Sequence, residues 1–137
     1  MRILCESMLE GKIIYKELCY QLNGIFYEIH NGLDRYFNHK QYADAMEIIF
    51  KEKGIKYKRE VDVPIEFSGG AIKGNRIDFL VEKLIPIDIK VEKYIIKADF
   101  MQMLRYLKAT KRKLGIIVNF REKTLKPKRV INFDIRI

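Results

Sequence analysis

Apolar residues recur every three or four positions in two early stretches of the chain, the spacing of helices with one buried face. The first stretch covers residues 7–30, and its apolar face is formed by Ile14, Leu18, Leu22, Ile25 and Ile29. Asn31-Gly32 predicts its end. The second covers residues 37–52, and its apolar face is formed by Tyr42, Ala45, Met46, Ile49 and Phe50. Gly54 stands where a C-terminal cap belongs.

The period then changes to two, which predicts strands. Alternation runs from Tyr57 to Glu66, Ser68-Gly69-Gly70 predicts a turn, and Gly74-Asn75 closes a longer loop. Two further alternating segments follow, and their apolar positions are Ile77, Phe79 and Val81, then Ile85, Ile87, Ile89 and Val91. Because only about two residues separate these segments, we expect an antiparallel hairpin.

The rest of the chain predicts a helix between two strands. The helix covers residues 96–110, and its expected buried stripe is Phe100, Met103, Leu104 and Leu107. The nearly continuous apolar run 114–120 is typical of a strand covered on both faces. Strand, helix and strand with short connections predict a parallel pair, and residues 129–137 alternate like an edge strand. The predicted fold is therefore α/β (an α+β mixed sheet): helix, helix, three antiparallel strands, helix, parallel strand.

The predicted hairpin places two carboxylates and a lysine together. Asp88 and Lys90 are two positions apart and share a face of their strand, and the hairpin brings Asp78 beside Asp88. Two carboxylates and an ammonium suit a hard divalent cation with a water beside it. The alternative is a half-solvated strand, on which all three are surface charges.

Size and charge narrow the classes of function. The 137 residues suit one domain, residues 1–137, and the net charge of +9 favours a polyanionic partner. The start Met1-Arg-Ile-Leu-Cys is too polar for a signal peptide, and no apolar run could cross a membrane, so we expect a cytoplasmic protein without membrane contact. Cys5 and Cys19, without CxxC spacing, argue against a zinc site or a disulfide framework.

Basic residues gather on either side of the predicted strand 114–120. The residues that we expect to contact a nucleic-acid backbone are Arg76, Lys108, Lys111, Arg112, Lys113, Lys128 and Arg129. Solvated turns would have a similar composition, and for Arg76 an ion pair on the sheet surface is the alternative.

The element order, with an aspartate on one strand and Asp88-x-Lys90 on the next, resembles the PD-(D/E)XK nuclease superfamily. Within it, the chain resembles the small bacterial and archaeal "GxxExxY protein" group. The segments that carry this resemblance are Gly24-x-x-x-Glu28-Ile29-His30, Arg76-x-Asp78-x-x-Val81-Glu82, Asp88-x-Lys90, Gln102-x-x-x-Tyr106-Leu107 and Gly115-Ile-Ile-Val-Asn119-Phe120. The resemblance implies a restriction-endonuclease-like core and a metal-dependent nuclease.

The resemblance also implies roles for residues. Asp78 and Asp88 would bind Mg²⁺ or Mn²⁺ with the backbone carbonyl of Ile89, and Lys90 would orient the attacking water. Gln102 and Tyr106 share a helix face, which in related nucleases borders the active site; Gln102 would position the lysine or a phosphate, and Tyr106 would contact nucleic acid. A polar helix face is the alternative for this pair.

Three positions depart from the group's pattern. Tyr36 and His39 stand where the group has its glycine and glutamate, and Asp88 replaces a glutamate. We interpret His39 as a packed histidine on the apolar side of its helix. Glu28 is a candidate for the missing carboxylate ligand, with a solvent-facing position as the alternative.

Two functions follow from these observations. The first is a metal-dependent deoxyribonuclease, a hydrolase of DNA phosphodiester bonds that acts alone, as a homodimer or as a subunit of a larger complex. The second is a nucleic-acid-binding or partner-binding module with little turnover on the same fold, which the replacement of the glutamate by His39 supports.

Overall fold

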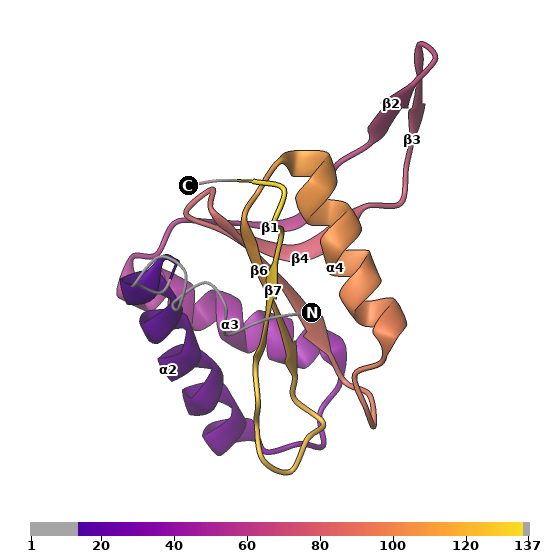
Figure 1. Cartoon of the computed structure of the whole chain (residues 1–137). Helices are drawn as coiled ribbons and strands as arrows, with labels where there is room; N and C mark the ends of the chain where they lie inside the picture. The colour runs from indigo at the N-terminus through magenta and orange to yellow at the C-terminus, as the bar shows by residue number, and fades with distance from the viewer. Residues whose placement is uncertain (1–13, 136–137) are drawn as a thin grey trace.

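The computed structural model describes residues 14–135, and its centre is a five-stranded sheet in the order β1-β4-β5-β6-β7 (Figure 1). Three helices pack on it, α2 (Lys16–Leu33), α3 (His39–Lys53) and α4 (Lys97–Thr110). The strands of the sheet are β1 (Tyr57–Asp62), β4 (Arg76–Val81), β5 (Ile85–Lys90), β6 (Leu114–Asn119) and β7 (Lys128–Ile131). A separate two-stranded hairpin is formed by β2 (Ile65–Phe67) and β3 (Gly70–Ile72).

The strand directions confirm the predicted mixed α/β fold. β1 pairs antiparallel with β4, and β4 pairs antiparallel with β5. The chain then crosses through α4 and returns as β6, which pairs parallel with β5. β7 lies antiparallel to β6 at the edge of the sheet, as the alternation after Arg129 predicts, although it ends at Ile131.

The sheet lies between two layers of helix. On one face, α2 and α3 pack against Phe79, Ile87 and Ile116 of three neighbouring strands, and we call this cluster the α2–α3 core. On the other face, Met103, Tyr106 and Leu107 of α4 pack against Ile77, Ile117 and Val130, which we call the α4 core. Every residue of β6 is buried, so the prediction of a strand covered on both faces is confirmed.

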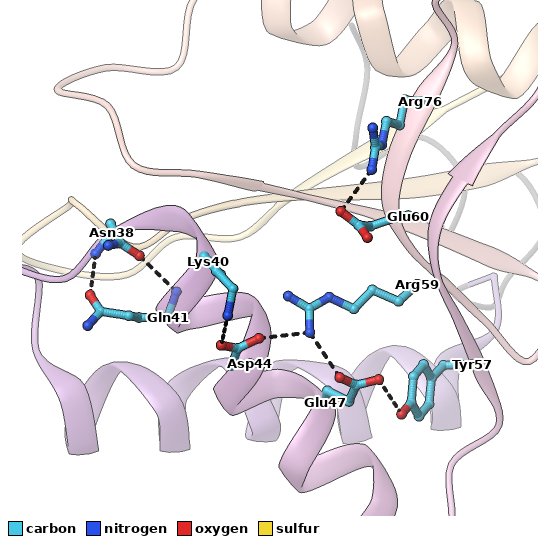
Figure 2. Close-up of polar contacts among 9 residues, drawn as sticks. All are labelled: Asn38, Lys40, Gln41, Asp44, Glu47, Tyr57, Arg59, Glu60 and Arg76. Atoms are coloured by element: carbon cyan, nitrogen blue, oxygen red, sulfur yellow. Dashed lines mark hydrogen bonds and ion pairs between the residues drawn. The ribbon is translucent and has the colours of Figure 1, made fainter.

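A capping box fixes the start of α3. The Asn38 side chain accepts a hydrogen bond from the Gln41 backbone N–H at 2.9 Å, and the Gln41 side chain accepts one from the Asn38 N–H at 3.0 Å (Figure 2). These bonds satisfy donors that the first turn of a helix leaves unpaired. They also hold His39, the first residue of the helix, in a defined position at the edge of the sheet.

Side chains of β1 bind α3 along its exposed flank (Figure 2). The Arg59 guanidinium lies 2.8 Å from a carboxylate oxygen of Asp44 and 2.9 Å from one of Glu47. The Tyr57 hydroxyl donates to Glu47 at 2.7 Å. The edge strand and the helix are therefore joined by charged and neutral hydrogen bonds as well as by apolar packing.

Some details differ from the sequence predictions. α2 continues through Asn31-Gly32 to Leu33, and the part of the first predicted helix before residue 14 lies outside the described residues. In α4, Met103 and Leu107 are buried as expected, but Phe100 and Leu104 are only half-buried, and Asp99 and Tyr106 are buried in addition. The buried face of α4 therefore includes Asp99, which the apolar pattern does not indicate, because polar groups of the sheet face the start of this helix.

The segment predicted as a turn and a longer loop forms the β2–β3 hairpin. Its turn at Ser68-Gly69 has positive φ angles of 50° and 78°, as the glycine-rich sequence predicts. The hairpin projects away from the rest of the molecule in Figure 1. Its apolar side chains Ile65, Phe67 and Ile72 are exposed. Within residues 14–135, no helix is long and apolar enough to cross a membrane.

Candidate active site

Asp78 lies where β4 separates from β5. The two strands pair from Val81–Ile85 to Phe79–Ile87, and the ladder stops there. The carboxylate of Asp78 then takes the place of the next backbone acceptor, because its Oδ2 accepts a hydrogen bond from the Ile89 N–H at 2.6 Å. Asp78 is therefore held by the backbone of the strand that carries Asp88 and Lys90.

The pleat of the sheet reverses at the same point. The register of β1 and β4 places Glu60 opposite Asp78. Phe79 belongs to the α2–α3 core, whereas Ile77, two residues away, belongs to the α4 core. Glu60 has a positive φ of 57°, and such a residue interrupts the alternation of a strand. The sequence expectation that Ile77, Phe79 and Val81 share a face is thus wrong at Ile77.

Asp88 and Lys90 share the α4 face of β5, as their spacing predicts. Asp88 is buried, with 6% of its surface exposed, and the Lys90 ammonium lies 3.0 Å from its Oδ2. The carboxyl groups of Asp78 and Asp88 lie close enough for each to shift the pKa of the other. The alternative of three solvated surface charges is therefore wrong, because two carboxyl groups and an ammonium share a largely buried site.

His39 completes this cluster from α3. Its Nε2 lies 3.0 Å from Asp78 Oδ2, and 44% of its side chain is exposed. Its interpretation as a packed histidine is wrong, because the imidazole contacts the first carboxylate and lines an open pocket with it. That pocket has a volume of 420 Å³ and lies between α3 and β1, where Lys40 and Arg59 also line it.

Lys90 is held by three groups. Besides Asp88, its ammonium donates to Gln102 Oε1 at 3.0 Å and lies 3.7 Å from Asp99 Oδ1. Gln102 and Asp99 are three residues apart on α4 and so lie on one face of the helix. The predicted proximity of Gln102 to Lys90 is confirmed by this contact, and Asp99 is an additional partner.

The charges in the cluster follow from burial and hydrogen bonding. Burial and the hydrogen bond with Asp78 raise the pKa of Asp88 to about 7, although Lys90 opposes this shift. Burial would also raise the pKa of Asp78, but hydrogen bonds from His39, Asp88 and the Ile89 N–H lower it. The hydrogen bond with Asp78 raises the pKa of His39. Below about pH 7 the two carboxyl groups therefore hold one proton between them, and it resides mainly on Asp88.

The donor set fits a hard divalent cation. Two adjacent carboxyl groups that cannot easily ionise together gain most from a cation. In a strand the N–H and C=O of one residue point to the same side. The Ile89 N–H faces Asp78, so its carbonyl lies on that side as well, whereas the Lys90 carbonyl accepts from the Phe120 N–H of the segment after β6. Among the described residues, no group of three or more His, Cys, Asp or Glu side chains forms a ready metal cage.

Two other predicted site residues lie apart from this cluster. Glu28 is exposed on α2, and no hydrogen bond or ion pair within residues 14–135 joins it to either aspartate. Tyr106 is 1% exposed, and its ring is packed in the α4 core. The structure therefore supports the solvent-facing alternative for Glu28 and places the Tyr106 ring where it cannot stack on a base.

The predicted basic residues lie in several places. Lys108 pairs with Asp134, the Arg112 Nε donates to the Lys83 carbonyl at 3.2 Å, and Lys113 donates to the Ile135 carbonyl at 2.6 Å. These residues and the exposed Lys111 surround the start of β6, whereas Lys90 lies beside its end. The six residues of β6 separate the two places by about 17 Å.

The remaining predicted cations lie on β7 and at the start of β4. Lys128 and Arg129 are half-buried on β7, and Arg129 donates to the Ile14 carbonyl at 3.3 Å. Arg76, at the start of β4, pairs with Glu60 at 2.8 Å (Figure 2). The expected alternative of a surface ion pair therefore holds for Arg76 in this structure.

Sequence reasoning missed three polar residues around Lys90. Asp99 accepts from the Ile96 N–H at 2.9 Å and hydrogen-bonds Glu92, which raises the pKa of Glu92 to about 7. Asn119 is fully buried and bonds both backbone groups of Glu92, at 2.7 and 3.1 Å. The spacing Asp99-x-x-Gln102 on one helix face was the available signal for Asp99.

Comparisons with known proteins agree with this geometry. A family model described as the PD-(D/E)XK nuclease superfamily matches residues 16–131. Three chains of solved structures match, among them one titled "Crystal structure of SSO0001", with 23% identity and a TM-score of 0.54. The match covers 68% of this chain and 49% of that one, so this chain spans about half of its length and the likeness concerns the fold alone. The search of curated proteins gave no match. With a matched segment that includes Asp78, Asp88, Lys90 and Gln102, the chain belongs to the PD-(D/E)XK nuclease superfamily.

Proposed function

We propose that this chain is a metal-dependent nuclease that hydrolyses phosphodiester bonds of DNA. The observation that carries the proposal is the contact of Asp78 with Asp88 beside an ammonium group that is itself oriented by Gln102. A purely structural ion pair would need one carboxylate for Lys90. Here a second carboxylate is held next to the first by a backbone N–H, at a cost that a bound cation would offset.

Asp78, Asp88 and the Ile89 carbonyl are the groups that would hold the metal. A bound Mg²⁺ or Mn²⁺ supplies a water of lowered pKa and polarises a phosphoryl oxygen. Lys90 would orient the attacking water and offset negative charge on the phosphate. Gln102 fixes the ammonium by accepting its hydrogen bond. Burial lowers the pKa of Lys90, but Asp88 and, to a smaller extent, Asp99 raise it above its ordinary value.

His39 favours a second candidate function, a nucleic-acid-binding module with little turnover. A protonated imidazole at 3.0 Å from Asp78 already neutralises this carboxylate and competes with a cation for it. In this second function the fold and the basic surface bind nucleic acid, and the site hydrolyses phosphodiester bonds slowly or not at all. Metal binding distinguishes the two functions.

The test of the proposed function is a cleavage assay on labelled single-stranded, duplex and branched DNA with Mg²⁺, Mn²⁺ or EDTA. We expect cleavage by the wild type with metal, and a loss of at least about a hundredfold in Asp88→Asn and Lys90→Ala. Asp62→Asn and Lys58→Ala are the matched controls, because both side chains are exposed on β1. No cleavage by the folded wild type, or equal loss in the controls, would contradict the proposal.

Calorimetry with Mn²⁺ gives an independent measurement. The wild type should bind Mn²⁺, and Asp78→Asn and Asp88→Asn should each lose this binding while Asp62→Asn retains it. A binding module without metal chemistry would bind DNA equally well in all of these proteins, with or without Mn²⁺. That outcome would establish the second function in place of the first.

We propose finer assignments from the sequence. They are membership of the GxxExxY group, one nuclease-like domain over residues 1–137, a cytoplasmic location, and action as a homodimer or within a larger complex. Size-exclusion chromatography with light scattering tests the homodimer.

A further inference from the structure

A basic hollow lies beside the candidate active site, at the end of the sheet where β5 and β6 finish. Its volume is 530 Å³, and it is lined by four cationic side chains and one acidic one. These are Arg35, Lys93, Arg121, Lys123 and Glu122. They come from the α2–α3 connection, the segment between β5 and α4, and the loop between β6 and β7, which gather at the lower end of Figure 1. A surplus of three positive charges in one hollow favours an anionic ligand.

The hollow adjoins the site through the backbone of β5. Val91, which lines the hollow, directly follows Lys90 in the chain. The Lys90 carbonyl accepts from the Phe120 N–H at 3.0 Å, one residue before Arg121. The hollow therefore borders the end of β5, the strand that carries Asp88 and Lys90.

Hydrogen bonds hold the walls of the hollow in place. The Arg121 guanidinium donates to the Arg35 carbonyl at 2.6 Å and to the Phe37 carbonyl at 3.0 Å. His30 of α2 bonds the Glu122 carbonyl at 2.8 Å. Because these bonds join the two loops, the cationic groups are positioned before any ligand binds, which lowers the entropic cost of binding.

One exposed aromatic ring lines the hollow, and a second follows Arg35 in the chain. Tyr94 is 69% exposed, and the Lys93 ammonium lies 5.6 Å from the centre of its ring. Tyr36 is 75% exposed and has the Arg35 guanidinium 5.9 Å from its ring centre. Exposed rings next to cations are the combination that binds unpaired bases and their phosphates without regard to sequence. Bases in a duplex are stacked on each other and cannot use such rings.

We propose that this hollow binds a single-stranded segment of DNA next to the scissile phosphate, with bases stacked on Tyr94 and Tyr36 and phosphates held by Lys93, Arg35 and Lys123. The inference rests on the proposed function and adds to it a substrate class. The strand would run from the hollow past the end of β5 to Asp88. The basic residues around the start of β6 lie at the opposite end of the sheet and have no part in this path.

The test measures binding without cleavage. Full-length Asp88→Asn protein in EDTA is titrated against a fluorescein-labelled oligothymidine of about ten nucleotides and against a duplex of the same length. We expect the single strand to bind more tightly than the duplex. Adding Tyr94→Ala or Lys93→Ala should weaken binding of the single strand by about tenfold each. The matched controls are Tyr20→Ala and Lys53→Ala, exposed residues of α2 and α3 away from the hollow, and these should leave binding unchanged.

Three results would overturn the inference: tighter binding of the duplex, unchanged binding in both hollow variants, or equal weakening in the controls. The outcome is independent of turnover. If the wild type cleaves DNA but the hollow variants bind as their parent does, this inference fails and the nuclease proposal stands. If no cleavage occurs but Tyr94→Ala and Lys93→Ala selectively lose binding of the single strand, the nuclease proposal fails and the hollow is still a binding site for single strands.

Discussion

His39 is the residue at which this site departs most from an acidic metal centre. Its imidazole occupies one side of Asp78, at the start of α3, where the related group that the sequence resembles has a glutamate. A histidine there stabilises the metal-free protein, because it adds a positive partner to a carboxylate that otherwise has the Ile89 N–H and the carboxyl group of Asp88 beside it. A glutamate would instead give the metal one more oxygen ligand and leave the metal-free site with excess negative charge.

We therefore expect His39→Glu to bind Mn²⁺ more tightly than the wild type, by about tenfold, and to be less stable without metal by about 1 kcal/mol. Calorimetry with Mn²⁺ and urea unfolding in EDTA measure the two effects. His39→Gln is the control, because it removes the imidazole without adding a carboxylate. If the glutamate variant bound Mn²⁺ no better than the glutamine variant, Asp78 and His39 would not border a metal site.

The second carboxyl pair, Glu92 and Asp99, gives a pH dependence. The hydrogen bond with Asp99, followed by burial, raises the pKa of Glu92 from 4.5 to about 7. Between these values the folded state holds more protons than the unfolded state, so the free energy of unfolding falls as pH rises. The lowered pKa of Asp99 has the opposite sign but acts only below its ordinary value of 3.8.

Glu92→Gln keeps a hydrogen-bonding group and removes this titration. We expect its free energy of unfolding to decline less than that of the wild type between about pH 5 and 7.5, by about 1 kcal/mol after solvent screening. Asp88 contributes to the decline in both proteins and cancels in the difference. Urea unfolding at the two pH values measures the difference between the wild type and Glu92→Gln. Glu52→Gln, an exposed change on α3, is the control. Parallel declines in wild type and Glu92→Gln would show that the pair does not share a proton.

At the scale of elements, the reversal of the β1 and β4 pleat positions Asp78. Glu60 adopts a left-handed conformation without being a glycine, at a cost of about 1 kcal/mol. Its side chain makes only an exposed ion pair with Arg76, with exposed fractions of 62% and 63%. Such a pair offsets little of the cost, so the conformation is imposed by packing on both sides of the reversal.

We expect Glu60→Gly to leave stability unchanged or raise it by up to about 1 kcal/mol, because glycine adopts a positive φ without strain. Glu60→Val should lower it by about 1–2 kcal/mol. Lys58→Gly is the matched control on the same exposed edge and should destabilise by about 0.5–1 kcal/mol. Urea unfolding compares the three, and a Glu60→Gly protein as destabilised as Lys58→Gly would argue against a strained reversal.

The helices and strands could be predicted from the sequence, but the reversal of the pleat at Glu60 could not. Helices and strands follow from the spacing of apolar residues, and the hairpin that brings Asp78 to Asp88 follows from the short gap between two alternating segments. A left-handed residue inside a strand has no sequence signal when it is a glutamate. The sequence likewise does not show which glycine is needed for close packing: Gly24 has open space around it, whereas a side chain at Gly115 would collide with the Met103 sulfur, because α4 crosses β6 closely there.

At the scale of the whole molecule, two basic runs flank β6 in the chain and lie at opposite ends of the sheet. Composition does not show which run lies near the carboxylates. The strand direction decides this: the run before Leu114 lies at the far end, and the loop after Asn119 lies beside Lys90. The cations that sequence analysis selected first, from Lys108 to Lys113, are therefore the more distant ones.

This division predicts where the salt dependence of DNA binding originates. Each phosphate neutralised on a single strand contributes about 0.7 to the slope of log affinity against log salt concentration. Replacing Lys93 and Lys123 together by alanine should make the slope shallower by about 1.4. Replacing Lys108 and Lys111, an equal loss of charge at the far end, should leave the slope nearly unchanged. Fluorescence anisotropy with oligothymidine across a salt series, on the Asp88→Asn protein in EDTA, measures both. A larger change in the second pair would place the strand at the start of β6, about 17 Å from Lys90, and would require the DNA to cross the α4 face to reach the carboxylates.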